Sequence, residues 1–534
     1  MITSARAIEP GRLLDANVCI VGAGAAGITL AIELERRGIN TVVLEGGGEA
    51  YDAQTQDLHD GECIGECRFD IRSTRLRRLG GTTQHWGGMS PRMVAGDLER
   101  RAAVPLSGWP IEYSELSRWY ETAAAFCEVS ERYWSRKMEE DEASGTAPRL
   151  VRGPLRTVLT PWSPPTRFGD RYKSHIRDSK RIHLILHANV CELRTGRSPE
   201  RVESVRVVTL HRGEWALRAR LFVLATGGLE VPRLLLNSKS AHPSGIGNGS
   251  GWVGRCYMDH LGLWSGVALF RKPFRQFQRL TEWLESGSSR ARYALVPQDA
   301  PEASNAQANF RFLLHQTPVS YEGVSASRRF VEEVSSLRLP SRFGPGIVDM
   351  LLDADELAAK ILKKPELGRD GGARLQSGVP LPHAFASLSM EQLPNPQSRV
   401  TLSESRDITG WPRLRLDWRL LPEDRENMRN AALQLGRAIA DNGLGSFYLP
   451  SFVRDLDLDG QLEIASHHMG TARMSAEARN GVVDLNLRLH EAHNVYVASS
   501  AVFPTGGWAN PTLTIVALAA RLASHLSSVE RQVR

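Results

Sequence analysis

Near the start of the chain, a short apolar run is followed by closely spaced glycines and then by an amphipathic stretch. The run Val18–Val21 is mostly β-branched, which predicts a buried parallel strand. Glycines within Gly22–Gly27 then open a predicted helix from Ala25 to Arg37, and Thr41–Leu44 predicts a second strand. The pattern is therefore strand, tight turn, helix and strand.

This order of elements is typical of a dinucleotide site. Gly22 permits a sharp turn, Gly24 lets the backbone approach a pyrophosphate, and Gly27 lets the helix pack on the strand. The helix N-terminus adds free N–H groups and a partial positive charge. Glu45 ends the second strand, where an acidic residue holds a ribose hydroxyl. A glycine-rich turn without a ligand is the competing interpretation.

The same reading predicts elements further along the chain. Tyr113–Phe126 and Pro422–Asn442 are predicted helices, the second ending at Gly443. The predicted strands are the pair Val202–His211 and Ala216–Ala225, and the later Ser398–Leu402 and Pro412–Trp418.

Glycines alone do not separate a nicotinamide from a flavin cofactor, but two later segments favour flavin. Phe222–Gly228 is an apolar strand that ends in small residues, and it resembles the return strand of two-dinucleotide-fold flavoproteins. Ser73–Gly88 flanks hydroxyls, an imidazole and an indole with glycines, a composition suited to laying backbone against a flat ring system. Both segments favour FAD over NAD.

These segments and several others resemble the glucose–methanol–choline (GMC) oxidoreductases along most of the chain. The matching pieces are Gly22–Glu45, Gly80–Gly88, Val253–His260, Glu391–Leu402, His467–Thr471 and Val495–Ile515. The resemblance implies an α/β fold, with a Rossmann-like FAD-binding domain and an interleaved α+β substrate domain that carries an antiparallel sheet. It also implies an FAD-dependent alcohol or sugar oxidase or dehydrogenase.

The domain boundaries follow from the same pieces. A discontinuous FAD-binding domain is expected over 12–100, 185–262 and 460–534, a substrate domain over 263–459, and a connecting helical segment over 101–184. The strands 398–402 and 412–418 are expected over the flavin. Residues 315–380 match the family least and are expected to set substrate choice or subunit contacts.

The resemblance also implies which residues line the cofactor. They are Gly22, Gly24, Ala25, Ala26, Gly27, Glu45, Gly80, Gly81, Thr82, His85, Trp86, Gly87, Gly88, Val190, Ala225, Thr226, Gly227, Ser500, Asn510 and Thr512. In relatives with a histidine at the position of His85, that imidazole can be joined to the 8α carbon of the flavin. Two alternatives stay open for His85: this covalent link, or packing under the isoalloxazine.

Catalysis of alcohol oxidation needs a base, because an alkoxide expels a hydride far better than an alcohol does. Neutral histidine, with a pKa near 6.5, suits that task at neutral pH. The family pattern His-x-x-Gly-Thr selects His467 over the adjacent His468, because Gly470–Thr471 sets the register. His468 is expected to pack or hydrogen-bond elsewhere.

The second catalytic position of the family, a histidine or asparagine, falls on Asn510. Its amide can donate to the substrate oxygen and steady the developing alkoxide, and Pro511 fixes the turn that presents it. An Asn-Pro turn without chemistry is the alternative. The chain departs from the family at Ser499–Ser500, where many members carry Asp, so hydrogen bonding near the flavin pyrophosphate or ribityl chain is expected to differ.

Composition narrows the class of protein. At 534 residues, with 42% apolar and 24% charged residues, the chain is an ordinary globular protein of two or more domains. The net charge of +6 comes from 66 basic and 60 acidic residues without a recognisable nucleic-acid module, so no nucleic-acid partner is expected.

The six cysteines and the apolar runs bear on the expected location. Cys63 and Cys67 invite a metal or disulfide interpretation, but no second Cys or His pair lies near, so reduced thiols are expected. No apolar core of a signal peptide begins the sequence, and no apolar run approaches the roughly 20 residues of a membrane span. A cytoplasmic protein without a membrane partner is expected; its oligomeric state is open.

We therefore expect FAD-dependent oxidation of a CH–OH group of a sugar, glycoside or polyol, with His467 as base and Asn510 orienting the oxygen. The pairing of these two residues and the Thr83–Trp86 segment look closest to the sugar-oxidising branch, such as pyranose oxidases. A natural-product or aryl alcohol is the alternative substrate. A non-redox lyase of the same fold and a flavin-binding protein without catalysis are the competing functions. The electron acceptor is oxygen or a quinone-type compound.

Overall fold

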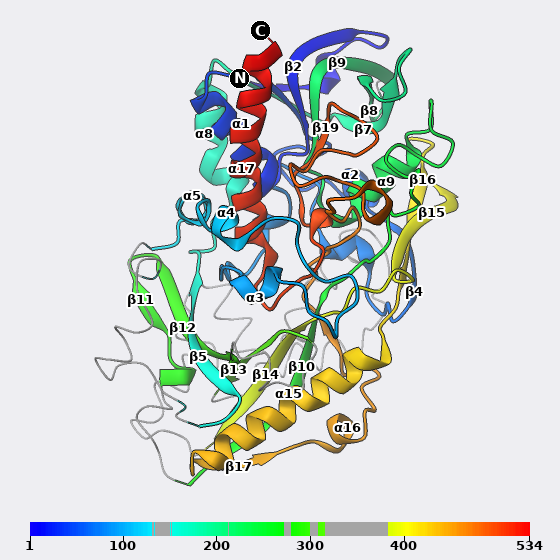
Figure 1. Ribbon diagram of the computed structural model, residues 1–534. Helices are drawn as coiled ribbons and strands as arrows, with labels where there is room; N and C mark the ends of the chain where they lie inside the picture. The colour runs from blue at the N-terminus through cyan, green and yellow to red at the C-terminus, as the bar shows by residue number, and fades with distance from the viewer. Residues whose placement is uncertain are drawn as a thin grey trace.

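A computed structural model of the chain has two large sheets, one above the other in Figure 1, joined by crossing segments. It describes residues 1–130, 133, 150, 152–211, 213–271, 279–298, 308–315 and 383–533. The segment 315–380, expected to set substrate choice or subunit contacts, lies outside the described residues apart from His315.

The upper sheet has the order β1-β6-β3-β2-β9-β8-β7, with β19 also paired to β9. The β7–β8 and β8–β9 pairings are antiparallel. All other pairings in this sheet are parallel. The strands are β1 (Ile2–Ser4), β2 (Leu13–Val21), β3 (Thr41–Leu44), β6 (Ile182–Leu186), β7 (Asn189–Thr195), β8 (Val202–Thr209), β9 (Gly213–Leu224) and β19 (Val495–Val497). The predicted strands at 18–21, 41–44, 202–211 and 216–225 all lie in this sheet.

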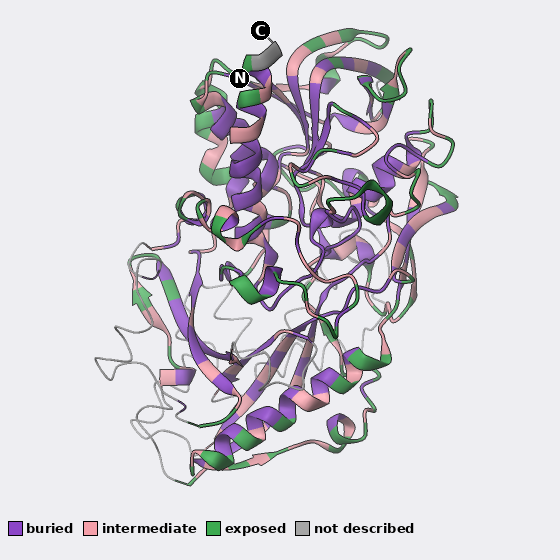
Figure 2. Ribbon diagram, in the orientation of Figure 1, coloured by how far each residue is buried: buried purple, intermediate pink, exposed green. Residues whose placement is uncertain are grey.

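Two buried helices pack together beside the upper sheet. Helix α1 (Ala25–Arg36) follows the glycine turn, and α17 (Pro511–Val533) packs along it. Both are largely buried in Figure 2. Residues 511–531 are long and apolar enough to cross a membrane, but 67% of the most apolar window is buried inside the protein. Their apolar character is explained by packing in the core.

The helix predicted over 113–126 is two helices. They are α4 (Tyr113–Ser117) and α5 (Tyr120–Phe126). At the break, the Trp119 N–H bonds to the Leu116 carbonyl, three residues back rather than four, at 3.0 Å. This tighter turn interrupts the helix without reversing the chain.

The lower sheet is antiparallel, with the order β11-β12-β13-β14-β10-β17. Its strands are β10 (His260–Phe270), β11 (Leu284–Ser286), β12 (Ser289–Pro297), β13 (Phe310–His315), β14 (His383–Glu391) and β17 (Gly445–Tyr448), with β5 (Leu155–Trp162) on β12 and β18 (Glu463–Ile464) on β10. Helix α15 (Pro422–Asp441) packs across β10, β14 and β17. Residues 101–184, expected only to connect, thus contribute β5 to this sheet.

From His383 to Met390, the residues of β14 alternate between two environments. Ala384, Ala386, Leu388 and Met390 are buried in the lower core with residues of α15, whereas the intervening residues are only partly buried. Because successive side chains of a strand point to opposite faces, the intervening residues face away from α15, towards the upper half. Figure 1 shows α15 on the far side of the lower sheet from that half.

A third, small sheet joins the two halves. Strand β16 (Pro412–Trp418) pairs antiparallel with β15 (Arg399–Arg406) and parallel with β4 (Gly61–Gly65). The strands predicted at 398–402 and 412–418 belong to this sheet.

At the end of β4 the chain turns back, and Cys63 and Cys67 form a disulfide with their Cα atoms 5.5 Å apart. The expectation of reduced thiols was wrong for this pair, because the local turn that brings the two residues together cannot be read from their spacing.

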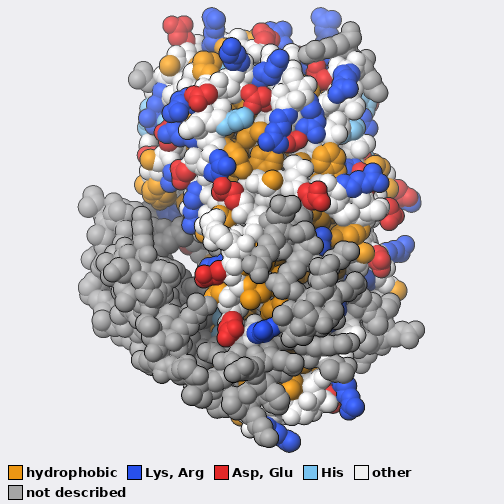
Figure 3. Space-filling model, turned by 90° about the vertical axis from the view of Figure 1, so that its left-hand side faces the viewer, with side chains coloured by type: hydrophobic (Ala, Val, Ile, Leu, Met, Phe, Trp, Pro, Cys, Tyr) orange, Lys and Arg blue, Asp and Glu red, His pale blue; other side chains and the backbone are white. Residues whose placement is uncertain are grey.

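The remaining elements are short, apart from α8 and α9. They are α2 (Ala53–Asp57), α3 (Ala95–Leu98), α8 (Phe168–Asp178), α9 (Gly227–Asn237), α16 (Ser451–Arg454), and the 3₁₀ turns η1 (Ala5–Ala7), η2 (Ile71–Thr74), η3 (Gly81–Gln84), η5 (Ala478–Asn480) and η6 (Ser500–Val502). On the face shown in Figure 3, basic side chains of the described residues lie among acidic ones.

Candidate active site

The turn between β2 and α1 requires glycine at two positions. Gly22 has φ of 102°, and a β-carbon there would lie 2.7 Å from the Ala225 carbonyl oxygen. A β-carbon on Gly27 would lie 1.9 Å from the Gly22 carbonyl oxygen. At Gly24, no non-neighbouring atom of the described residues lies within 4 Å of such a carbon. The turn is therefore tightly packed on both sides of Gly24 and open at it.

Glu45 closes the same turn at the end of β3. Its carboxylate is buried and accepts hydrogen bonds from the N–H groups of Ala23 at 2.9 Å and Gly47 at 2.8 Å. A β-carbon on Gly46 would lie 2.8 Å from both Arg77 and Asn189, so these side chains pack directly on the backbone beside Glu45.

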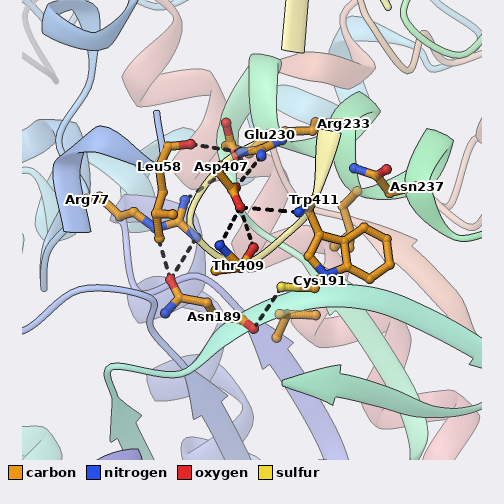
Figure 4. Close-up of a pocket in the computed structure, with 12 residues that line it drawn as sticks. Leu58, Arg77, Asn189, Cys191, Glu230, Arg233, Asn237, Asp407, Thr409 and Trp411 are labelled. Atoms are coloured by element: carbon orange, nitrogen blue, oxygen red, sulfur yellow. Dashed lines mark hydrogen bonds and ion pairs between the residues drawn. The ribbon is translucent and has the colours of Figure 1, made fainter. Parts of the chain in front are cut away.

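Arg77 and Asn189 also line the cavity drawn in Figure 4, together with Val190. An ion-pair network crosses this cavity: Arg233 contacts Asp407 at 2.6 Å and Glu230 at 3.4 Å. Val190, which was expected to face the cofactor, thus lies beside the turn that follows β3. The cavity is lined by neither His467 nor Asn510.

The segment Gly80–Gly88 lies on the glycine turn. The Gly80 N–H donates to the Ala23 carbonyl at 2.8 Å, and a β-carbon on Gly81 would lie 3.2 Å from the Gly24 Cα. Thr82 and Gly87 are exposed, and His85 follows η3 half-buried. The Trp86 indole N–H donates to the Thr166 carbonyl at 2.9 Å, which anchors the far end of the segment.

The return strand β9 also reaches the turn. The Ala225 N–H donates to the Val21 carbonyl at 2.8 Å, and Thr226–Gly227 begins α9. The Thr226 hydroxyl oxygen is buried without a hydrogen-bond partner among the described residues. A β-carbon on the next residue, Gly228, would lie 2.1 Å from the His468 carbonyl oxygen, so α9 starts against the histidine pair.

The structure brings His467 and Asn510 together. The Asn510 Nδ2 lies 3.2 Å from the His467 Nε2, and the Asn510 Oδ1 accepts a hydrogen bond from Arg311 at 2.7 Å. Because Oδ1 faces a guanidinium, which can only donate, the amide nitrogen is the group that faces His467. The orientation of the Asn510 amide is therefore set by Arg311.

A second histidine sets the tautomer of His467. The His260 Nε2 lies 2.8 Å from the Gly507 carbonyl oxygen and must carry a hydrogen to bond it. In a neutral ring, the His260 Nδ1 is then an acceptor, and it lies 2.7 Å from the His467 Nδ1. His467 consequently holds its hydrogen on Nδ1, which leaves the Nε2 lone pair beside Asn510.

The loop that carries His467 is held at both ends. The Asp259 Oδ1 accepts hydrogen bonds from the N–H groups of His467 at 2.8 Å and His260 at 2.7 Å. The Ser500 hydroxyl donates to the His468 carbonyl at 2.6 Å, and the Ser500 carbonyl accepts from Gly470 at 3.1 Å. Ser499 caps η6 through its own side chain. These serines therefore fix the loop, and Thr512 lies half-buried in the first turn of α17.

His468 points away from Asn510. It is buried, and its Nδ1 lies 2.9 Å from the Tyr257 hydroxyl while its Nε2 lies 2.9 Å from the Thr74 hydroxyl. Both ring nitrogens are thus used in packing contacts between η2 and the segment before β10.

Two family models match the segments of the chain that form the glycine turn and the segment that carries His467 and Asn510. Residues 17–244 match the FAD dependent oxidoreductase model, and residues 394–519 match the GMC oxidoreductase model. The chain belongs to the GMC oxidoreductase family. It is an FAD-dependent enzyme that oxidises CH–OH groups.

Several relatives are similar to this GMC oxidoreductase over nearly their whole length. The 6'''-hydroxyparomomycin C oxidase of Streptomyces lividus is 26% identical, over 98% of this chain and 94% of the relative. The fructose dehydrogenase large subunit of Gluconobacter japonicus is 22% identical, over 96% of this chain and 97% of the relative.

A solved structure confirms the fold. The pyridoxine 4-oxidase from Mesorbium loti superposes with a TM-score of 0.57 at 18% identity, covering 96% of this chain and 99% of that one. The predicted α/β fold, with an FAD-binding domain and a separate sheet-rich domain, is confirmed.

The residues of the glycine turn fit the FAD that this GMC oxidoreductase requires. The open backbone at Gly24 and the uncapped N-terminus of α1 can receive a pyrophosphate. The buried Thr226 hydroxyl supplies an unused hydrogen-bonding group beside them, and Glu45 supplies carboxylate oxygens at the ribose position.

Burial controls the charge of His260, His467 and Arg311 in this GMC oxidoreductase. It lowers the pKa of His260 to about 4 and, together with the nearby His260 and Arg311, lowers the pKa of His467 well below 6.5. Both rings are therefore neutral at pH 7, as the hydrogen-bond pattern requires. Burial also lowers the pKa of Arg311 to about 9, which leaves the guanidinium charged.

Arg311, His260 and Asp259 were not predicted as site residues. His260 and Asp259 lie in the matching piece Val253–His260, so their place near the cofactor could have been suspected from the sequence. Arg311 lies in β13, 199 residues before Asn510, and only its position on the alternating strand gives a signal.

Proposed function

We propose that this GMC oxidoreductase oxidises a CH–OH group of a sugar, glycoside or polyol, with His467 as the general base and Asn510 orienting the substrate oxygen. The observation that carries this proposal is the His467 Nε2 lone pair, which faces the Asn510 amide at 3.2 Å and is fixed there by His260. When bound, FAD supplies the hydride acceptor at N5.

The two side chains perform complementary tasks. A substrate hydroxyl bound against both side chains donates its proton to the His467 Nε2, while an Asn510 N–H donates to the same oxygen in place of the direct contact between the two residues. As the proton leaves, that second hydrogen bond strengthens because the oxygen gains negative charge. The proton on the His467 Nδ1 stays on its bond to His260 throughout.

The sugar part of the proposal is supported by relatives. Fructose dehydrogenase matches along the whole chain, and a C-glycoside 3-oxidase from Microbacterium trichothecenolyticum is 32% identical over 24% of each chain. The partly buried side chains of β14 that face away from α15 are His383, Phe385, Ser387 and Ser389, and such aromatic and hydroxyl groups suit a hydroxylated ring.

An anaerobic screen tests the proposal. The purified holoenzyme is mixed with sugars, glycosides, polyols and aryl alcohols without oxygen, and loss of the visible flavin absorbance is recorded. Bleaching by a sugar or polyol supports the proposal, and bleaching only by aryl alcohols overturns its substrate class. If no alcohol bleaches the flavin, the redox role of His467 and Asn510 is wrong.

Two further experiments identify the electron acceptor and the role of His85. Mixing the reduced enzyme with oxygen or with a quinone identifies the acceptor by which of them restores the absorbance faster. Acid precipitation distinguishes the two roles of His85: yellow colour in the pellet that is lost in His85→Ala indicates a covalent bond, and colour in the supernatant indicates packing only.

A further inference from the structure

Arg311 is a buried cation at the site of proton removal. Its side chain comes from β13 and is 7% exposed, and within the described part of the chain its guanidinium makes one hydrogen bond, to the Asn510 Oδ1 at 2.7 Å. Among the described residues, no Asp or Glu forms an ion pair with it, and its Nε is buried without a partner. Other buried arginines do have acidic partners, such as Arg101 with Glu391 and Arg233 with Asp407.

A buried charge without a counter-charge is costly, so proteins pair such groups with an opposite charge or a ligand. The strand register places Arg311 on the ligand side of the lower sheet. Arg311 is opposite Ser389 on β14, and Ser389 lies on the partly buried face that points away from α15. The same face carries Ser387 and, on β10, Trp264 opposite it. The cation therefore belongs to the substrate-facing surface.

We propose that Arg311 binds a carboxylate of the substrate, and that the enzyme prefers hydroxylated acids, such as sugar acids, over neutral or cationic polyols. This inference rests on the proposed function of His467 and Asn510. Only the Asn510 amide separates the Arg311 guanidinium from the position of the reacting oxygen. The carboxylate is therefore expected on a carbon close to the one that is oxidised.

Three compounds with one carbon skeleton test the charge preference: gluconate, glucitol and glucamine, which are anionic, neutral and cationic. We expect gluconate to reduce the flavin anaerobically with a KM about tenfold to hundredfold below that of glucitol, the usual worth of a charge-assisted hydrogen bond. Glucamine should have the highest KM of the three compounds. Where a compound does not reduce the flavin, its affinity is read from the shift it causes in the visible flavin spectrum.

Variants of Arg311 test whether this side chain causes the preference for gluconate over glucitol. Arg311→Gln should raise the KM or Kd for gluconate to that for glucitol, and Arg311→Lys should retain part of the difference. Arg290→Gln is the matched control, because Arg290 lies on β12 of the same sheet but is exposed and stacks on Trp283. If Arg311→Gln does not fold, competitive inhibition by succinate replaces it, and this inhibition should be weaker in Arg311→Lys than in the wild type.

The results distinguish failure of the Arg311 proposal from failure of the proposed function. Equal KM and Kd values for gluconate and glucitol in the wild type, unchanged in Arg311→Gln, overturn the role of Arg311 and leave the proposed oxidation intact. Absence of flavin reduction by every alcohol overturns the proposed function, while the spectral titration still reports whether Arg311 binds carboxylates.

Discussion

At the scale of single residues, the site depends on which nitrogen of His467 carries the hydrogen. The Gly507 carbonyl fixes the His260 ring, His260 fixes the His467 ring, and Arg311 fixes the Asn510 amide. In the proposed mechanism, the lone pair that accepts the proton and the N–H that binds the oxygen are thus both oriented before a substrate arrives. Such preorganisation avoids the cost of reorienting dipoles during the reaction.

His467→Ala should lower the rate of flavin reduction by about 10²- to 10⁴-fold, because a positioned base is lost. FAD content should not change, since the cofactor residues lie on the glycine turn. Stopped-flow reduction and the absorbance ratio of flavin to protein measure the two effects. His468→Ala is the comparison, and a larger loss of rate in that variant would show that the wrong histidine had been assigned.

Asn510→Ala should slow reduction by about 2.7–4 kcal/mol in activation free energy, the loss seen when one oxyanion donor is removed. Asn510→Asp should be slower still, because a carboxylate repels the developing alkoxide and raises the pKa of His467. The same stopped-flow assay applies to both. If Asn510→Ala reduced the flavin at the wild-type rate, Asn510 would have no role in the reaction and would serve only to form the turn with Pro511.

The pH dependence follows from the lowered pKa of His467. The ring must be unprotonated to accept a proton, so the reduction rate should stay level as pH falls to 6.5 and decline only below it. Burial is the largest cause of this lowering, and repulsion by Arg311 and by the protonated forms of His260 and His468 adds to it. Arg311→Gln should therefore move the acid limb to higher pH, whereas Arg290→Gln should not. An acid limb above pH 6.5 in the wild type contradicts the assignment.

At the scale of elements, backbone packing decides how the cofactor is held. The turn from β2 into α1 has a closely packed glycine on each side and an open one between them. Its neighbours β9 and η3 touch it through backbone atoms rather than side chains. The turn consequently has no room for a side chain at Gly22 or Gly27, whereas it leaves space at Gly24.

Gly27→Ala should abolish FAD retention and lower the thermal midpoint, because the new methyl would overlap the Gly22 carbonyl oxygen at 1.9 Å. Gly24→Ala should fold with a nearly unchanged midpoint and bind FAD more weakly, since its methyl enters the space left for the pyrophosphate. Thermal unfolding and flavin content separate the two variants. Equal loss of stability in both would show that Gly24 is also packed.

The sequence was informative where a motif is local. Gly22, Glu45 and the order of β2, α1 and β3 could be predicted because sharp turns and strand ends leave signals within a few residues. His467 and Asn510 could be proposed from family motifs. The Cys63–Cys67 disulfide depends on a turn that its spacing does not reveal, and the contact of Arg311 with Asn510 depends on how two distant segments pack. Such contacts carry no local signal.

At the scale of the whole molecule, the segments that fit FAD, which include β2, β3 and β9, also hold the upper sheet together. Because FAD binds only the folded protein, removing it should lower stability, by about 4 kcal/mol relative to a free FAD concentration 1,000-fold above Kd. The thermal midpoint of the stripped protein should rise again when FAD is added. In Glu45→Ala, the added FAD should raise the midpoint less. An unchanged midpoint on stripping would mean that the binding site is not coupled to folding.

The pairing of early with late segments has a consequence for biosynthesis. Helix α1, near the start of the chain, packs against α17 near residue 533, and β9 has β19 as a neighbour. During translation, the buried residues of α1 lack this packing partner until α17 has left the ribosome. We therefore expect stable burial of α1, and stable FAD binding at the turn before it, only after α17 has been synthesised.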